Sequence, residues 1–327
     1  MNEPVLHGAD WPLFGWSDDV RPAMASALAA GRPVVLATLF KVEGSAPRGP
    51  GAQMLFDGGA DGIRASGYFS GDCIEGDVAR HAAEVLANGQ PQRLHYGMGS
   101  PWIDIRLRCG GALHVLVERI APDNAAAQEV LEHMRARRQC IWSSDGREQR
   151  VLTGGGPLLR LEGDRIARRF DPLRRLVVSG GDPGALALAS LAQQANFETV
   201  LVRPDGPAAP PPFPVARYMR NSVVAALEAL GIDAWTGFIG ATHEDHHDLA
   251  ACLHALRHGA AWVGMIGAKS RAGGRMAALE AAGASKDELA RLNLSPGVAG
   301  LGKAPFEVAT GILAQVMQAM NPALERA

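Results

Sequence analysis

The stretch Val177-Val178-Ser179-Gly180-Gly181-Asp182-Pro183-Gly184-Ala185 decides the fold of the C-terminal half of this 327-residue chain. Apolar β-branched residues lead into a glycine pair, and a run of helix-forming residues begins at Ala185. A strand, a glycine turn and a helix in this order are typical of the first unit of a dinucleotide-binding sheet. We therefore predict a Rossmann-like fold around this stretch.

The sequence on either side of the stretch continues the same alternation of strands and helices. Buried strands alternating with amphipathic helices indicate a parallel, doubly wound sheet. The predicted strands are Leu176–Ser179, Thr199–Val202, Phe238–Thr242 and Ala261–Ile266, and the predicted helices are Ala185–Ala195, Ser222–Leu230, Asp245–His258 and Pro305–Met320.

The N-terminal half has a different pattern, which predicts a mixed α+β domain. Its elements are a helix from a Ser17 cap to Ala30, strands at Pro33–Phe40 and Ala112–Glu118, a hairpin of Gln53–Phe56 with Gly62–Tyr68, and a helix at Asp77–Asn88. Asp171-Pro172 marks a boundary, since a residue before proline avoids helical geometry. We expect an α/β protein whose domains are residues 1–171 and 172–327.

Composition narrows the class of protein. A formal net charge of −2 provides no basic field for nucleic acid. No apolar run reaches the ~18 residues that a membrane span requires, and the N-terminus does not resemble a secretion signal. We expect a cytoplasmic protein whose four cysteines are free thiols, without a structural zinc site because no C-x-x-C pair occurs.

Three glycine-containing motifs carry candidate binding residues in the N-terminal half. They are Gly44-Ser45-Ala46-Pro47-Arg48, Ser70-Gly71-Asp72-Cys73-Ile74-Glu75 and Cys109-Gly110-Gly111. Together they offer a cation, two thiols and a backbone that a ligand can approach closely. These residues also have less specific interpretations than ligand binding. A lone cysteine is often a core residue, as we expect for Cys140 and Cys252; Arg48 suits a surface ion pair; and Glu75 suits either loop ordering or proton acceptance.

Taken in order, these motifs resemble the XdhC/CoxI family. The resemblance implies a non-catalytic accessory protein that binds molybdenum cofactor, supports its sulfuration and delivers it to a xanthine-dehydrogenase-like molybdenum hydroxylase. Implied partners are that enzyme, a cysteine desulfurase and a second copy of the chain. The implied cofactor-binding residues are Arg48, Cys73, Glu75, Cys109, Gly110 and Gly111. Asp72 stands where the family has glycine, so Cys109 is the preferred thiol.

A basic turn in the second half also resembles the family. Lys269 and Arg271 follow the strand that ends at Ile266 and match the family's Gly-Ser-Arg turn. They suit a phosphate at a helix N-terminus, and the alternative is an exposed basic face or a contact between subunits. In the glycine loop Pro296–Gly302, Ala299 replaces an acidic residue of the family.

The dinucleotide-like loop departs from the fingerprint that binds NAD. Gly180 fits its first glycine, but Asp182 stands where the backbone should approach pyrophosphate, beside Gly181. A carboxylate about 4 Å from a phosphate charge is repelled by roughly 4 kcal/mol at an effective dielectric of 20, whereas at a helix N-terminus it stabilises the helix by about 1 kcal/mol. In NAD-binding sheets an acidic residue at the end of the second strand binds the ribose hydroxyls, and Arg203 stands at that place in this chain. We expect a Rossmann fold without dinucleotide binding.

Two rival functions remain open. Because arginine suits the phosphate of NADP, Arg203 leaves an NADP-dependent oxidoreductase as an alternative. The altered positions Asp72, Asp182, Arg203 and Ala299 also fit a divergent scaffold that docks client enzymes without cofactor.

A histidine-rich stretch, His243-Glu244-Asp245-His246-His247, satisfies the H-E-x-x-H expression in a strand-turn-helix setting. We interpret it as a solvated helix start and assign no metal site, with metal binding as the lesser alternative.

Overall fold

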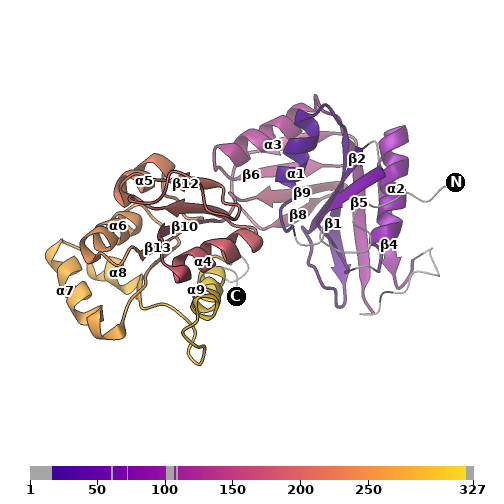
Figure 1. Cartoon of the computed structure of the whole chain (residues 1–327). Coiled ribbons are helices and arrows are strands. Elements are labelled where there is room, and N and C mark those ends of the chain that lie inside the picture. Colours follow the sequence, from indigo (N-terminus) through magenta and orange to yellow (C-terminus); the bar gives the residue numbers. More distant parts are fainter. Residues whose placement is uncertain (1–16, 60–61, 72, 101–106, 108–109, 322–327) are drawn as a thin grey trace. The chain divides into compact units, whose positions relative to one another are not determined.

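The computed structural model describes residues 17–59, 62–71, 73–100, 107 and 110–321. The chain divides into two compact units, the first ending at Pro172 and the second beginning at Leu173 (Figure 1). We call them unit 1 and unit 2 and describe each by itself.

Unit 1 is built on a five-stranded antiparallel sheet with the strand order β3-β2-β1-β5-β4. The expected hairpin is confirmed, since Gly59 of β2 pairs with Gly62 of β3. Strand β4 was not predicted. The strands are β1 (Val34–Glu43), β2 (Gln53–Gly59), β3 (Gly62–Ser66), β4 (Gln92–Gly97) and β5 (Ala112–Ile120).

Helices and a second sheet bury the two faces of this sheet (Figure 1). Helix α2 (Glu75–Asn88) packs its apolar side on one face, and a left-handed Gly89 ends it. Helices α1 (Arg21–Ala29) and α3 (Ala125–Arg135) share a core cluster with the other face. The second sheet has the order β7-β6-β9-β8, from β6 (Cys140–Ser144), β7 (Gln149–Leu152), β8 (Leu159–Glu162) and β9 (Arg165–Phe170).

Helix α1 begins later than predicted, and Ser17 does not cap it. The Ser17 hydroxyl donates to the carbonyl of Asp19 at 2.7 Å, while the Asp19 carboxylate accepts from the backbone N–H of Arg21 at 2.9 Å. Arg21 is 1% exposed and pairs its guanidinium with the same carboxylate. The chain before α1 is therefore shaped by this buried ion pair, because a buried guanidinium needs a partner.

The pairing of β1 with β5 in unit 1 contains a register shift. The pairing of β1 with β5 runs from Val34↔Ile120 to Leu39↔Val115 and then shifts, so that Lys41 pairs with His114 and Glu43 with Ala112. One residue of β1, Phe40, is thus left out of the pairing as a β-bulge.

Unit 2 is a six-stranded parallel sheet with the order β12-β11-β10-β13-β14-β15. Counted from β10, this is the order 3-2-1-4-5-6 of dinucleotide-binding sheets. The strands are β10 (Arg175–Gly180), β11 (Glu198–Val202), β12 (Arg217–Met219), β13 (Thr236–Ala241), β14 (Trp262–Met265) and β15 (Leu292–Leu294).

Helices cover both faces of the parallel sheet. Helices α4 (Pro183–Gln194) and α9 (Pro305–Ala319) share one core cluster, while α5 (Val223–Leu230) and α6 (Asp245–Arg257) share another. A short helical turn η2 (Lys269–Arg271), α7 (Ala272–Ala281) and α8 (Lys286–Ala290) follow β14, and a Ser285–Glu288 capping box begins α8. Among the described residues, none of the helices combines the length and apolarity that crossing a bilayer requires.

Candidate functional site

The three motif loops of unit 1 leave the five-stranded sheet at the same edge. Strands β1, β3 and β4 end at this edge and their antiparallel neighbours β2 and β5 begin there. The described residues of the connections at this edge are 44–52, 67–71, 73–74, 98–100, 107 and 110–111. Topology therefore gathers, from three separate parts of the sequence, the turn that carries Arg48, the loop that carries Cys73, and Gly110-Gly111.

Glycines allow two of these loops to touch through their backbones. A Cβ atom at Gly111 would lie 2.4 Å from the carbonyl oxygen of Ser45 and 2.8 Å from that of Glu43. At Gly97, whose φ is +93°, a Cβ would lie 2.1 Å from the carbonyl oxygen of Gly111. No side chain fits at either position, because such separations are far shorter than van der Waals contact.

Glu75 organises the Cys73 loop from within. One carboxylate oxygen accepts the backbone N–H groups of Phe69 at 2.9 Å, Ser70 at 2.7 Å and Gly71 at 3.2 Å. The other accepts the Ser70 hydroxyl at 2.6 Å and the N–H of Ile74 at 3.2 Å. Burial raises the pKa of Glu75, but the hydrogen bonds from Ser70 and the backbone lower it by a larger amount. The pKa of Glu75 therefore lies below its ordinary value. Of the two roles considered, loop ordering is the one that this geometry supports.

Arg48 is held by two residues that no sequence pattern singles out. Its guanidinium pairs with the carboxylate of Asp18 and lies over the ring of Tyr68, 4.8 Å from the centroid. Burial lowers the pKa of Arg48, but hydrogen bonding to Tyr68 and Asp18 raises it above its ordinary value. Because Tyr68 lies two residues before Ser70, this contact joins the Arg48 turn to the Cys73 loop.

The cysteines fall into distinct environments. Cys73 is half-buried at the margin of the core cluster under α2, and its backbone N–H donates to Ser70 Oγ at 3.0 Å. Cys140 and Cys252 are buried, and burial raises the pKa of both thiols, which confirms them as core residues. The predicted Cys109 and the neighbouring Asp72 lie outside the described residues.

Side chains from three turns of unit 2 occupy its dinucleotide-like loop. One carboxylate oxygen of Asp182 accepts the N–H groups of Gly184 at 2.7 Å and Ala185 at 3.2 Å, which confirms the predicted helix cap. The other lies 3.0 Å from Nε2 of His243. Gly181 lies against Arg203, since a Cβ there would be 2.3 Å from Arg203 Nε. An incoming pyrophosphate would have to displace Asp182.

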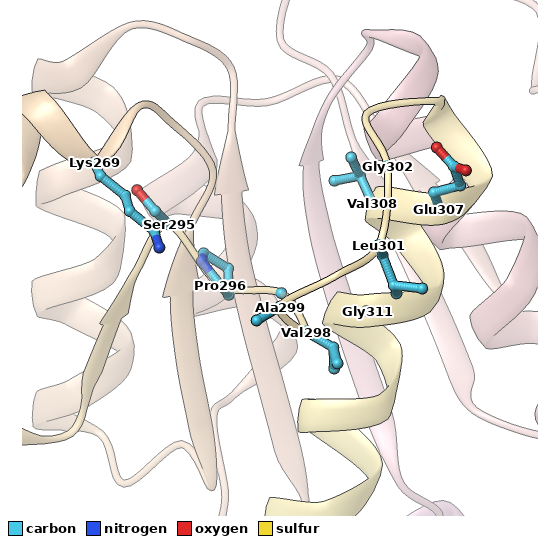
Figure 2. A pocket seen from close by; sticks show the side chains of 11 residues that line it. Lys269, Ser295, Pro296, Val298, Ala299, Leu301, Gly302, Glu307, Val308 and Gly311 are labelled. Atoms are coloured by element: carbon cyan, nitrogen blue, oxygen red, sulfur yellow. The ribbon is translucent and has the colours of Figure 1, made fainter.

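Lys269 and Arg271 lie in different environments. Arg271 donates to the carboxylate of Asp245 at 2.6 Å, so its charge is already paired. Lys269 instead lines a pocket of about 250 Å³ between the end of β15 and the first turns of α9 (Figure 2). The pocket wall is the glycine loop that includes Ala299, and Glu307 borders its far end.

A profile of the XdhC and CoxI family matches residues 27–97, and a profile of the XdhC Rossmann domain matches residues 176–316. The chain belongs to the XdhC and CoxI family. The predicted resemblance is thereby confirmed, and the two matched ranges lie in unit 1 and in unit 2 respectively.

Two relatives are similar in sequence to this XdhC/CoxI family member. It is 26% identical over 306 residues to the molybdenum cofactor insertion chaperone PaoD of Escherichia coli (strain K12), covering 92% of this chain and 88% of that protein. It is 26% identical over 279 residues to a probable xanthine dehydrogenase subunit of Bacillus subtilis (strain 168), covering 72% of this chain and 80% of that protein.

A solved structure supports the fold of this XdhC/CoxI family member. The crystal structure of a xanthine dehydrogenase from Bacillus halodurans aligns with a TM-score of 0.73 and 23% identity, covering 94% of this chain and 96% of that one. The predicted fold class, an α+β domain followed by a Rossmann-like parallel domain, is confirmed.

Proposed function

We propose that this protein is a molybdenum cofactor chaperone that binds the cofactor at the loop edge of unit 1, supports its sulfuration and delivers it to a xanthine-dehydrogenase-like molybdenum hydroxylase. The observation that carries the proposal is the convergence of three glycine loops, with Arg48 and a half-buried Cys73, at one edge of the five-stranded sheet. The similarity to a protein named as a molybdenum cofactor insertion chaperone supports it.

The residues of this edge fit the chemistry of the cargo. Molybdenum cofactor presents a phosphate, a pterin with hydrogen-bonding edges, and a soft metal-dithiolene centre. Arg48 supplies a cation with 23% of its side chain exposed, and the phosphate would compete with Asp18 for it. Gly110 has a φ of +70°, and no atom of the described residues lies within 4 Å of its Cβ position, so we expect a ligand to approach this backbone closely.

The thiols complete the proposed site. Thiolates are soft ligands that suit soft metal centres and sulfur transfer, and we assign this role to Cys109, with Cys73 as the second candidate. Glu75 acts as a positioning residue, because its carboxylate is engaged in holding the loop from Phe69 to Ile74. Gly111 has no side chain of its own and keeps the Gly110 backbone against the Arg48 turn.

The proposed function also implies partners, a cellular location and an oligomeric state. The client enzyme receives the cofactor, a cysteine desulfurase supplies the sulfur, and the chaperone itself is non-catalytic, works in the cytoplasm and pairs as a homodimer. The pocket beside Lys269 in unit 2 is a second surface that we assign to anion binding, without Arg271, whose guanidinium is paired with Asp245.

The test is co-purification of pterin with the full chain from a host that makes molybdenum cofactor. Pterin fluorescence after denaturation should be present for the wild type and reduced at least tenfold in Cys109→Ala and Arg48→Gln. Arg32→Gln is the matched control, because Arg32 also pairs with an aspartate, Asp57, but at the opposite edge of the sheet. Transfer is then measured as activity restored to a cofactor-free molybdenum hydroxylase.

Three outcomes separate the alternatives. Wild-type binding by both variants would show that the cofactor lies elsewhere on the chain. An absence of pterin, together with stable binding to the hydroxylase, would favour a docking scaffold. Micromolar binding of NADP without pterin would favour the oxidoreductase.

A further inference from the structure

Within the described part of the chain, the proposed function leaves a cluster of metal-ligand-type side chains unused. Glu244, His246 and His247 lie at the start of α6, just after β13 ends. Nε2 of His247 is 3.4 Å and Nε2 of His246 is 3.9 Å from the same carboxylate oxygen of Glu244. One ligand atom from each of the three lies within 4.8 Å of the other two.

The neighbouring charged groups are engaged with other partners. The carboxylate of Asp245 pairs with Arg271 and Arg275, at 2.6 Å and 2.9 Å. Asp248 accepts the backbone N–H of Thr242 at 3.1 Å. The carboxylate and the two imidazoles of the cluster therefore face one another and the solvent, with 58%, 73% and 51% of the Glu244, His246 and His247 side chains exposed.

These separations suit a metal ion. Zinc binds imidazole nitrogen and carboxylate oxygen at about 2.0–2.2 Å, which places neighbouring tetrahedral ligands about 3.3 Å apart. The separations from Glu244 to His247 and to His246 therefore require only small side-chain adjustments. The cluster also lies at the carboxyl edge of a parallel strand, where open α/β sheets hold their ligands. The partial positive charge at the N-terminus of α6 repels a cation bound there, and the negative charge of Glu244 compensates for this repulsion.

We propose that Glu244, His246 and His247 form a three-ligand site for a borderline divalent ion of the zinc and nickel class. Two nitrogen ligands and one oxygen ligand select such ions over Mg²⁺ and Ca²⁺, which prefer all-oxygen sites. Three protein ligands leave coordination positions open to water or to a further ligand, which is the arrangement of exchangeable rather than structural sites. This site is independent of the cofactor edge in unit 1.

The test is calorimetric titration of the untagged full chain with Zn²⁺ and, separately, with Mg²⁺. We expect one Zn²⁺ per chain with a dissociation constant in the micromolar range, and no binding of Mg²⁺. Glu244→Gln and His247→Ala should each weaken Zn²⁺ binding at least tenfold while leaving circular dichroism unchanged, because both side chains are exposed.

A second histidine pair on the same helix provides the matched control. The rings of His254 and His258 stack with centroids 4.0 Å apart, so this pair is an alternative chelate. His254→Ala should leave Zn²⁺ binding unchanged. Zinc binding that is lost in His254→Ala and retained in Glu244→Gln would overturn the proposal.

Co²⁺ titration distinguishes the cluster from the thiols. Co²⁺ on nitrogen and oxygen ligands gives visible d–d bands without the thiolate charge-transfer bands of a cysteine site. A spectrum dominated by thiolate charge transfer, or the absence of saturable Zn²⁺ binding, would likewise refute the site.

Discussion

His243 Nε2 lies 3.0 Å from one oxygen of the Asp182 carboxylate, and the other oxygen caps helix α4. His243 makes this contact from a left-handed backbone conformation, with a φ of +67°, which is uncommon for a residue with a side chain. The turn after β10 is thus closed by a contact from the turn after β13, at the place where dinucleotide-binding sheets hold a phosphate.

Replacement of Asp182 tests this closure. Because Asp182→Ala removes the helix cap and the His243 contact, we expect a loss of about 1 kcal/mol in the free energy of unfolding, measured by urea denaturation. Asp205→Ala, at an exposed neighbouring loop position, should change stability by less than about 0.5 kcal/mol. In calorimetry the wild type should bind neither NAD nor NADP with micromolar affinity; tight binding of either would contradict the closure.

Replacement of Glu75 tests the loop that carries Cys73. Glu75→Gln should lower the free energy of unfolding at pH 7 by about 2–4 kcal/mol, because the buried N–H groups of Phe69, Ser70 and Ile74 lose a charged acceptor. Since the folded-state pKa of Glu75 is lowered from 4.5, its contribution is complete above that pH and is lost as the pH falls through the folded-state pKa.

Urea denaturation at several pH values measures this difference. The gap between wild type and Glu75→Gln should be widest near neutral pH and narrow in acid. A gap that widens on acidification would contradict the assignment. Glu84→Gln, on the exposed side of the same helix, is the control with little expected effect.

A methyl group at Gly111 tests the backbone contact between the Arg48 turn and the loop before β5. Gly111→Ala places Cβ 2.4 Å from the carbonyl oxygen of Ser45, so the two loops must separate. We expect a loss of about 1–3 kcal/mol in stability and, under the proposed function, a loss of co-purified pterin. Gly49→Ala should be neutral in both measurements, because no atom in the described part of the chain lies within 4 Å of the added methyl.

Thiol reactivity tests the environments of the cysteines. Burial raises the pKa of Cys140 and Cys252 and so lowers their thiolate fraction. In a Cys109→Ser background, a disulfide reagent should therefore titrate one thiol rapidly in the native protein. Adding Cys73→Ser should abolish that phase and leave the two buried thiols to react only on unfolding. Rapid reaction of either buried thiol would be inconsistent with its position in the core.

Elements with a strong apolar pattern or a clear cap were predictable, and elements without such a signal were not. Helices α2, α5 and α9 and strands β1, β10 and β11 follow from apolar periodicity and caps. Strand β4 escaped prediction because its six residues, Gln92–Gly97, are half polar and are strand only through pairing with β5. Strands β12 and β15 have three residues each, too few for a periodic signal.

The candidate site shows a similar division. The motifs are local in sequence, so their binding residues could be proposed before the fold was known. Their shared edge depends on the order of the five strands, which no local pattern reveals. The ion-pair partner of Arg48 is Asp18, which lies thirty positions away in sequence and is brought to it only by the tertiary structure. The hydrogen bonds to Glu75 fall within six residues, and for that reason its loop-ordering role was already one of two candidates.

The bulge at Phe40 has an evolutionary consequence. Without it, continuous pairing would set Glu43 opposite Gly111 instead of Ala112, and every facing pair beyond Leu39 would slip by one position. The number of residues between Leu39 and Gly44 should therefore be inherited more strictly than their identities. A change of side chain there leaves the register intact, whereas the insertion or deletion of a single codon would shift the pairing of β1 with β5 and move the Arg48 turn relative to Gly111.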